Sequence, residues 1–284
     1  MNRRNFLQMA AAAGLGLVGV DALVFEPSFI EYTEHTLGED VSGHFRTKAT
    51  IIQISDLHLR DLAWHHHDLA EKINAIKPEF LFFTGDIIDK GRNIPLLHEF
   101  LNLFNNDMAK IAILGNWERQ AVRDMASFRN IYEDHCCDLL VNQSKVYDVR
   151  GSRVIVTGLD DLYEGLPDFS GALRNVSRER NHIVLAHCPQ HRDFIINDIA
   201  AINSTAAEDK KITVDYIFSG HTHGGQVSLF GSIPFLPRGS GRYVRGWYKD
   251  KRPHLYVSRG IGTSMFPIRL GARAEVPVFT CYLR

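Results

Sequence analysis

The feature that most strongly constrains this fold is a series of short apolar runs, each followed by polar residues. Such runs occupy residues 49–54, 80–84, 111–114, 153–157, 183–186 and 216–219. Helix-like patterns separate the earlier runs, at residues 64–76, 94–104 and 119–132. Continuous apolar runs indicate strands that are buried on both faces, and helices between them are typical of parallel sheets. The sequence therefore predicts an α/β fold.

The two ends of this pattern have a different character. Residues 31–48 are polar, so we expect residues 23–48 to form an irregular lead-in. The last 60 residues are rich in glycine and proline, with strands expected near 254–258 and 276–282 and little helix. Because no repeat or linker divides residues 49–284, we expect them to form a single domain.

The N-terminus has the features of a targeting segment. Arg3 and Arg4 precede Phe6 and Leu7, and a mildly apolar run covers residues 9–20, which resembles a twin-arginine export signal. The run is shorter than the roughly 20 residues of a membrane-spanning helix. Residues 1–22 are therefore predicted to be a signal or an anchor, and a buried first helix is the alternative. The protein is then membrane-associated, either exported or tethered at the inner face of the cytoplasmic membrane.

Composition excludes several classes of protein. The 284 residues carry 32 Lys and Arg against 33 Asp and Glu, for a net charge of -1. A chain without a basic excess is not expected to bind nucleic acid. The 4 cysteines are too few for a disulfide scaffold of this length. The 14 histidines are the unusual count, and they call for a chemical explanation.

Metal-ligating residue types follow five of the predicted strands. They are Asp56 and His58, then Asp86, then Asn116, then His187, and finally His221 with His223. Ligands of α/β sheets bind beyond the carboxyl ends of the strands, so these side chains are expected to converge. Each residue alone is more typical of a loop or a helix cap, but the joint pattern predicts one metal site.

The ordered motifs D-x-H, G-D-x-x-D, G-N-x-E, a lone His and G-H-x-H resemble those of the calcineurin-like metallophosphoesterase family, over about residues 50–282. The N-terminal segment, residues 221–226 and residues 258–263 resemble a bacterial branch of it. That branch includes membrane-associated phosphodiesterases and a UDP-2,3-diacylglucosamine pyrophosphatase of lipid A synthesis. The fold implied by the resemblance is a two-sheet β-sandwich flanked by helices.

The resemblance also implies a dinuclear metal centre. The first ion would be held by Asp56, His58 and His223, the second by Asn116, His187 and His221, and Asp86 would bridge both. Mixed nitrogen and oxygen ligands suit Mn²⁺, Fe or Zn²⁺. A metal-bridging hydroxide is the implied nucleophile, so Asp86, Asn116 and His187 would be catalytic through the metals.

One position departs from the family pattern G-N-H-[DE]. Trp117 stands where the family has a His that stabilises or protonates the leaving group. An indole N–H donates a hydrogen bond but cannot act as a general acid. Glu118 would orient that His, and it is expected to lose this role here. Simple packing of Trp117 at the edge of the site is the alternative interpretation.

Three further residues are candidates for substrate binding. His65 begins a predicted helix and either lines the cleft or forms a polar helix start. Arg242 and Arg245 lie in the aromatic and basic stretch 235–252, which suits a substrate phosphate or an anionic lipid surface. A solvated hairpin is the third possibility for this stretch.

These features predict a phosphohydrolase that cleaves a phosphodiester or pyrophosphate bond in a lipid-linked substrate such as UDP-2,3-diacylglucosamine. The alternatives are a general phosphodiesterase acting on exported phospholipid or small diesters, and a catalytically weak metal-binding scaffold. The expected partners are a phosphorylated substrate and a membrane surface, and the oligomeric state stays open.

Overall fold

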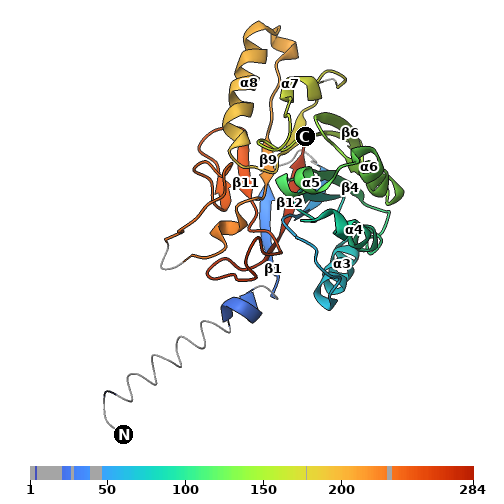
Figure 1. The fold of residues 1–284 in the computed structure, drawn as a ribbon. Coiled ribbons are helices and arrows are strands. Elements are labelled where there is room, and N and C mark those ends of the chain that lie inside the picture. Colours follow the sequence, from blue (N-terminus) through green and yellow to red (C-terminus); the bar gives the residue numbers. More distant parts are fainter. Residues whose placement is uncertain (1–3, 5–20, 27–28, 39–46, 177, 229–231) are drawn as a thin grey trace.

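Two β-sheets pack face to face, and helices cover their outer faces (Figure 1). The structure is a computed structural model that describes residues 4, 21–26, 29–38, 47–176, 178–228 and 232–284. Most of the predicted targeting segment therefore lies outside the described residues. Among the residues that are described, no helix is long and apolar enough to cross a bilayer. The predicted α/β sandwich is confirmed.

The first sheet is mostly parallel. Within the described chain it has the order β1 (Glu31–Leu37), β12 (Glu275–Leu283), β2 (Thr47–Ile54), β3 (Phe80–Thr84), β4 (Ala109–Ile113) and β5 (Cys137–Leu139). Only the pairing of β12 with β2 is antiparallel among the described pairs of this sheet. The carboxyl ends of β2, β3 and β4 therefore lie at the same edge.

The second sheet is also mostly parallel. Its order is β10 (Gly246–Tyr248), β11 (His254–Val257), β9 (Tyr216–Ser219), β8 (Asn181–Leu185), β7 (Ser152–Gly158) and β6 (Gln143–Val149). Strands β7, β8, β9 and β11 are parallel, and β6 and β10 are antiparallel edge strands.

Side-chain alternation along the strands explains the layers. In β3, Phe80 and Phe82 face the second sheet and meet Phe218 and other residues of its inner face. Leu81 and Phe83 point the other way, toward the helices. Successive side chains of a strand point to opposite faces, so a strand covered on both sides is apolar throughout. This is why the short apolar runs were visible in the sequence.

The helices lie on the two outer faces. The first sheet is covered by α3 (Trp64–Ile76), α4 (Ile94–Leu101) and α6 (Met125–Asp134), and the second by α7 (Phe169–Ala172) and α8 (His191–Thr205). The prediction for α3 is confirmed. The helix predicted over 94–104 ends at Leu101. Short one-turn helices η2 (Gly91–Asn93) and η3 (Glu208–Lys210) lie before α4 and after α8.

The single helix predicted over 119–132 is wrong, because the chain forms α5 (Asn116–Ala121) and then α6. Val122 is extended, and the side chain of Asp124 accepts hydrogen bonds from the backbone N–H groups of Ala126 and Ser127, which starts a new helix. Helix α8 was not predicted, although Ile195, Ile199 and Ile202 pack against the second sheet.

The prediction that residues 23–48 are irregular is also wrong. Residues 31–37 form β1, which pairs in parallel with β12, and the backbone of β1 enters the sheet despite its polar sequence. An edge strand exposes one side to water, so hydrogen bonds to β12 compensate for a weak apolar pattern. The first sheet thus begins before residue 49.

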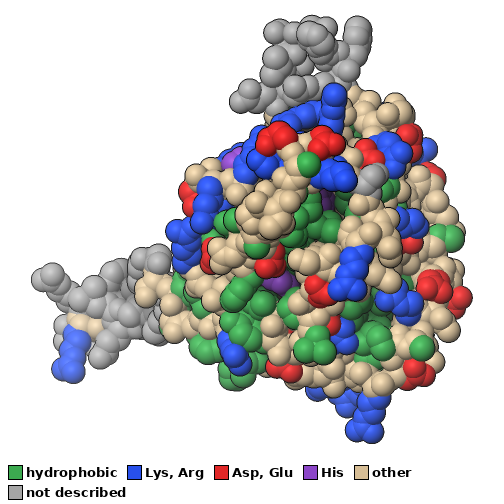
Figure 2. Space-filling model, turned by 90° about the horizontal axis from the view of Figure 1, so that it is seen from above, with side chains coloured by type: hydrophobic (Ala, Val, Ile, Leu, Met, Phe, Trp, Pro, Cys, Tyr) green, Lys and Arg blue, Asp and Glu red, His purple; other side chains and the backbone are tan. Residues whose placement is uncertain are grey.

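Charges of both signs are interspersed on the face shown in Figure 2. Hydrophobic side chains lie between them, and no single sign dominates this face. The view agrees with the near-zero net charge of the chain.

Candidate metal centre

Seven residues after the strand ends form what we call the ligand cluster: Asp56, His58, Asp86, Asn116, His187, His221 and His223. Ligand atoms of Asp56, His58 and His223 lie within 4.8 Å of one another, and so do those of Asp86, His187 and His221. These residues follow β2, β3 and β4 of the first sheet and β8 and β9 of the second, and the contacts between their ligand atoms show that these strands end at the same side of the sandwich.

Asp86 connects the two groups of three. Its Oδ2 lies 3.1 Å from Nε2 of His187 and 4.0 Å from Nε2 of His58. His58 in turn lies 3.1 Å from His223, measured between their Nε2 atoms. One carboxylate therefore stands between two sets of ligand atoms, which is the position of a bridging ligand.

The backbone that carries the cluster is strained. Positive φ angles occur at Asp56 (51°), His58 (48°), Asp86 (55°), His221 (72°) and His223 (51°). Such angles are uncommon outside glycine and concentrate at functional sites. Each strand here turns sharply at its end, which points the ligand side chains into the shared space.

A glycine permits the close approach of two of these turns. A Cβ on Gly115 would lie 2.1 Å from Oδ1 of Asp86 and 2.5 Å from the Asp86 backbone nitrogen. Any side chain at position 115 would therefore displace Asp86. The glycine before Asn116 is required by this contact and not by helix geometry.

Hydrogen bonds orient two of the imidazoles. Nδ1 of His187 lies 2.8 Å from the carbonyl of Thr84, and Nε2 of His221 lies 2.7 Å from the carbonyl of Arg238. A carbonyl can only accept, so these nitrogens carry the protons. The other nitrogens, Nε2 of His187 and Nδ1 of His221, lie 3.2 Å apart and face the cluster.

Burial keeps most of the imidazoles neutral, as metal ligation requires. It lowers the pKa of His58 and His221, and it lowers the pKa of His223 well below the usual value, helped by His58 and Arg269. His187 is the exception. Burial opposes its protonation, but the adjacent Asp86 carboxylate prevails and raises the pKa of His187 well above the usual value.

Two buried polar atoms show that the cluster fits metal ions. Oδ1 of Asn116 and Nδ1 of His58 have no hydrogen-bond partner among the described residues. An unsatisfied buried polar atom costs about 1–3 kcal/mol, and such atoms in native structures require an explanation. A cation would satisfy the Asn116 oxygen, and mixed imidazole, carboxylate and amide ligands suit first-row divalent ions.

Glu118 has a structural role that the sequence did not reveal. Its buried carboxylate accepts hydrogen bonds from the backbone N–H groups of Gly115, Asp86, Ile87 and Ile88. Glu118 therefore holds the turn that carries Asp86, a role distinct from orienting a His at position 117, which the sequence pattern did not predict. Burial and the nearby Asp86 raise the pKa of Glu118 to about 7, while the N–H donors oppose this shift.

Arg269 was also missed, because it lies outside every motif. It is fully buried, and its guanidinium donates to the carbonyls of Arg259, Gly260, Gly262 and Ala272. Its Nη2 also lies 3.4 Å from Nδ1 of His223. Burial lowers the pKa of Arg269 to about 10. Arg269 thus fixes the loop after β11 against a member of the ligand cluster.

Trp117 lies at the edge of the cluster. Its backbone N–H donates to Oδ1 of Asp86 at 2.9 Å, and its indole contacts the His58 ring edge-on, with centroids 5.9 Å apart. It also lines the cleft above the cluster. Trp117 therefore packs against His58 and also faces the cleft.

The cluster opens into a cleft of about 640 Å³. One side of the cleft is formed by what we call the apolar rim: Val227, Pro234, Phe235, Pro237, Met265 and Phe266. Arg238 also lines the cleft, and its guanidinium stacks 4.0 Å from the ring of Tyr163. The ligand cluster beside the apolar rim suits a bound molecule with one anionic part and one apolar part.

The three residues that we predicted to bind substrate lie outside the described lining of the cleft. His65 contacts the rings of Trp64 and His66 in α3. Arg242 forms an ion pair with Asp250, and Arg245 donates to the carbonyl of Gly271. None of the three is among the described lining residues.

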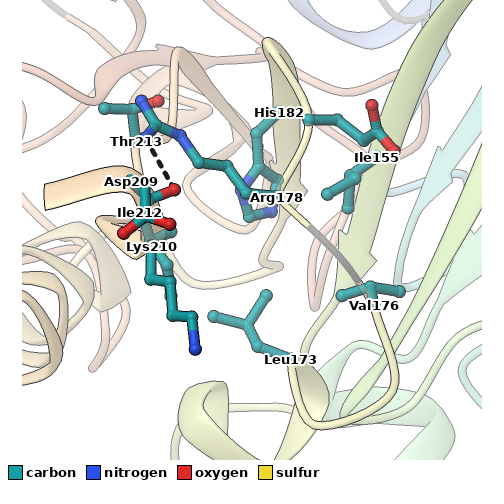
Figure 3. A pocket seen from close by; sticks show the side chains of 10 residues that line it. Ile155, Leu173, Val176, Arg178, His182, Asp209, Lys210, Ile212 and Thr213 are labelled. Carbon is teal, nitrogen blue, oxygen red and sulfur yellow. Dashed lines mark hydrogen bonds between the residues drawn. The ribbon is translucent and has the colours of Figure 1, made fainter. Parts of the chain in front are cut away.

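A second cavity of about 400 Å³ lies beside β7 and β8. Figure 3 shows His182, Arg178 and Lys210 around it, with Arg178 donating to the Asp209 carbonyl at 3.3 Å. Its described lining contains no member of the ligand cluster, so the cleft is the better candidate for the active site.

Comparisons with known proteins agree with this geometry. A sequence profile described as "calcineurin-like phosphoesterase" matches residues 49–225. The uncharacterized metallophosphoesterase YkuE of Bacillus subtilis is 33% identical, over 99% of this chain and 97% of its own. YkoQ of the same organism, also an uncharacterized metallophosphoesterase, is 28% identical over 81% of this chain and 83% of its own. The phosphodiesterase YaeI of Escherichia coli is 28% identical over 97% of both chains.

Proposed function

This chain belongs to the calcineurin-like phosphoesterase family and is a metal-dependent phosphoester hydrolase, and on that premise we propose that it cleaves a pyrophosphate or phosphodiester bond in a lipid-linked substrate. UDP-2,3-diacylglucosamine is a representative of this class. The observation that carries the proposal is the apolar rim, which adjoins the ligand cluster in one cleft. The phosphate would meet the cluster, and the acyl chains would meet the rim.

The ligand cluster supplies the residues that hold the metals. Asp56, His58 and His223 form one group, and His187 and His221 form the other with Asp86, which also lies near His58. Asn116 lines the same cleft with an unpartnered Oδ1, and we assign it to the second group. When bound, two divalent ions would polarise the phosphoryl oxygens and activate water for attack on phosphorus. Thr84 and Arg238 orient two imidazoles through their carbonyls, and Glu118 holds the Asp86 turn.

The leaving group distinguishes the possible bonds. Among the described residues that line the cleft, the charged or titratable side chains are Arg238 and the ligands Asp86, His221 and His223. Arginine cannot give up a proton, although it binds phosphate well. A phosphate monoester, with a second pKa of about 6, leaves without protonation, whereas an alkoxide does not. Pyrophosphate cleavage therefore suits this cleft better than cleavage of alkyl diesters.

A lipid-linked substrate also bears on location. Residues 9–20 are proposed to keep the protein at the membrane, as an uncleaved anchor at the inner face or as part of a twin-arginine signal. A nucleotide-linked lipid would require the inner face. The second candidate, a general phosphodiesterase on exported phospholipid or small diesters, is favoured by the name of the E. coli relative.

The test compares three substrates with the full-length protein, after chelation and with Mn²⁺ added back. They are UDP-2,3-diacylglucosamine, its deacylated counterpart and bis(p-nitrophenyl) phosphate. Because each buried methylene contributes about 0.8 kcal/mol, the acylated pyrophosphate should exceed the deacylated one in kcat/KM by more than about tenfold. Equal values would overturn the lipid assignment. Turnover of the aryl diester alone would favour the general phosphodiesterase.

A further inference from the structure

We propose that the mouth of the cleft is a membrane-docking face, which seats the protein on an anionic lipid bilayer with the apolar rim among the headgroups. The proposal deepens the proposed function, because it states how a lipid-linked substrate would reach the ligand cluster. Three independent features of the described residues support it: exposed apolar side chains, the position of the N-terminal segment, and two arginines outside ion pairs.

The most exposed part of the rim is large and apolar. Phe235, Met265 and Phe266 are 68%, 69% and 65% exposed, yet they come from two segments about thirty residues apart in the chain and line the same cleft. Soluble proteins seldom gather exposed large apolar side chains, and such groups mark membrane or protein contacts. Aromatic and apolar side chains around a cleft are suited to the boundary between headgroups and acyl chains.

Residues 22–26, where the predicted targeting segment ends, form hydrogen bonds with the loop that carries Met265 and Phe266. The backbone N–H of Arg269 donates to the carbonyl of Ala22 at 3.0 Å, and those of Gly271 and Ala272 donate to the Glu26 carboxylate at 2.9 and 3.2 Å. Figure 1 shows the π-helical turn η1 (Asp21–Phe25) beside the dark red loop between β11 and β12.

The apolar run 9–20 directly precedes this turn in the sequence, and Leu23 within the turn is 55% exposed. A membrane contact by residues 9–20 would therefore bring the loop with Met265 and Phe266 to the same surface. This continuity favours a bilayer over a second protein as the occupant of the face.

Two exposed arginines add charge beside the same loop. Arg245 donates to the carbonyl of Gly271 at 2.7 Å, and Arg273 follows two residues later. Neither forms an ion pair with another described residue, so both charges are available to anionic headgroups. Arg242 differs, because Asp250 neutralises it at 3.0 Å. Basic residues near an anionic membrane contribute about 1 kcal/mol each.

The orientation can be tested with vesicles that contain no substrate. The full-length variants Phe235→Trp and Phe266→Trp are mixed with phosphatidylglycerol/phosphatidylcholine vesicles in which the phosphatidylcholine is brominated. The matched control is Leu166→Trp, at an apolar position that is 84% exposed on the loop before α7, where its neighbours are Asn142 and Asp160. Any anchor effect of residues 9–20 is the same in all three variants.

We expect quenching above the wild-type background to be at least about twofold stronger for the two rim variants than for the control, because indole at the boundary of headgroups and acyl chains contacts the bromines. Equal quenching at all three positions would overturn the docking face. A change in emission with rising protein concentration and no lipid would assign the face to a second copy of the chain and would also overturn it.

The charges are tested by sedimentation with the same vesicles. Arg245→Gln combined with Arg273→Gln should lower the partition coefficient by roughly fivefold per arginine, and Arg242→Gln should change it little. An equal loss in the control would refute the role of the two arginines. Since no substrate is present, these results stand apart from hydrolysis: loss of acyl preference would overturn the proposed function and leave the docking face intact.

Discussion

The ligand cluster and the apolar rim share one cleft, but the chain builds them differently. The cluster comes from strand ends, and its histidines and aspartates are at most 7% exposed, with five of them at positive φ. The rim comes from the glycine- and proline-rich segments after β9 and β11, and its largest side chains are about two-thirds exposed. The strand ends hold the ligand cluster, and the loops carry the apolar rim that we propose to contact the substrate, a division that is common in enzymes.

The difference teaches where each kind of change should act. A substitution in the cluster disturbs several buried groups at once and should affect every substrate. A substitution in the rim changes exposed surface and should affect only substrates or membranes that contact it. The following predictions test this division, and the largest effect comes first.

Asp86→Asn should have the largest effect, because this carboxylate lies between both groups of ligands. Both metal content and turnover should fall by more than about 100-fold, since even partners outside the ligand set are worth 10–100-fold. The control is Asp89→Asn, whose carboxylate pairs with Arg60 and accepts a hydrogen bond from Asn93, and which acts on the cluster through its charge near His58. Metal analysis of both purified variants decides the matter, and equal metal content would refute the bridging role.

Glu118→Gln should have the next largest effect. The amide replaces one acceptor oxygen with a donor that faces backbone N–H groups, which costs about 1–3 kcal/mol for each donor left unsatisfied. Urea unfolding without metal should show this loss, and metal affinity should fall by roughly 10–100-fold. The control is Glu133→Gln, at an exposed position of α6. If both variants unfold alike, Glu118 does not hold the Asp86 turn.

Arg269→Lys should affect both the ligand cluster and the loop that carries part of the apolar rim. Lysine cannot replace the fork of donors that joins His223 to the carbonyls of Gly260 and Ala272. We expect roughly tenfold weaker metal binding together with faster hydrogen exchange in the loop that carries Met265. An exchange pattern identical to that of the wild type would show that the cluster and the rim are independent.

Trp117→His should have the smallest effect. In the wild type, rates should fall steeply as the pKa of the leaving group rises, because Trp117 cannot donate a proton. A His would supply a general acid worth up to about 10²–10⁴-fold. The gain should stay below about tenfold, because Glu118 already accepts four backbone N–H groups and is not free to orient the ring. A graded series of diesters measures the slope. A flat slope in the wild type, with chemistry rate-limiting, would contradict the argument.

Much of the fold could be predicted from local patterns in the sequence. Strands β2, β3, β4, β8 and β9 are buried on both faces, so their apolar runs stand out, and polar ligands follow at once. Helix α3 was recognised with its boundaries. These features depend on residues adjacent in the chain, which is why residue types and spacing sufficed to expect the cluster at the carboxyl ends of the strands.

Other features depend on residues that are distant in the sequence. Strand β1 has a polar sequence and exists through its pairing with β12, more than two hundred residues away. The role of Arg269 beside His223 and the gathering of Phe235 with Met265 likewise arise only when the loops fold over the strand ends. Burial and hydrogen-bond partners at such positions are properties of the assembled molecule. The sequence alone thus determined the ligand types and their order, whereas the tertiary structure decided what supports them and which surface lies beside them.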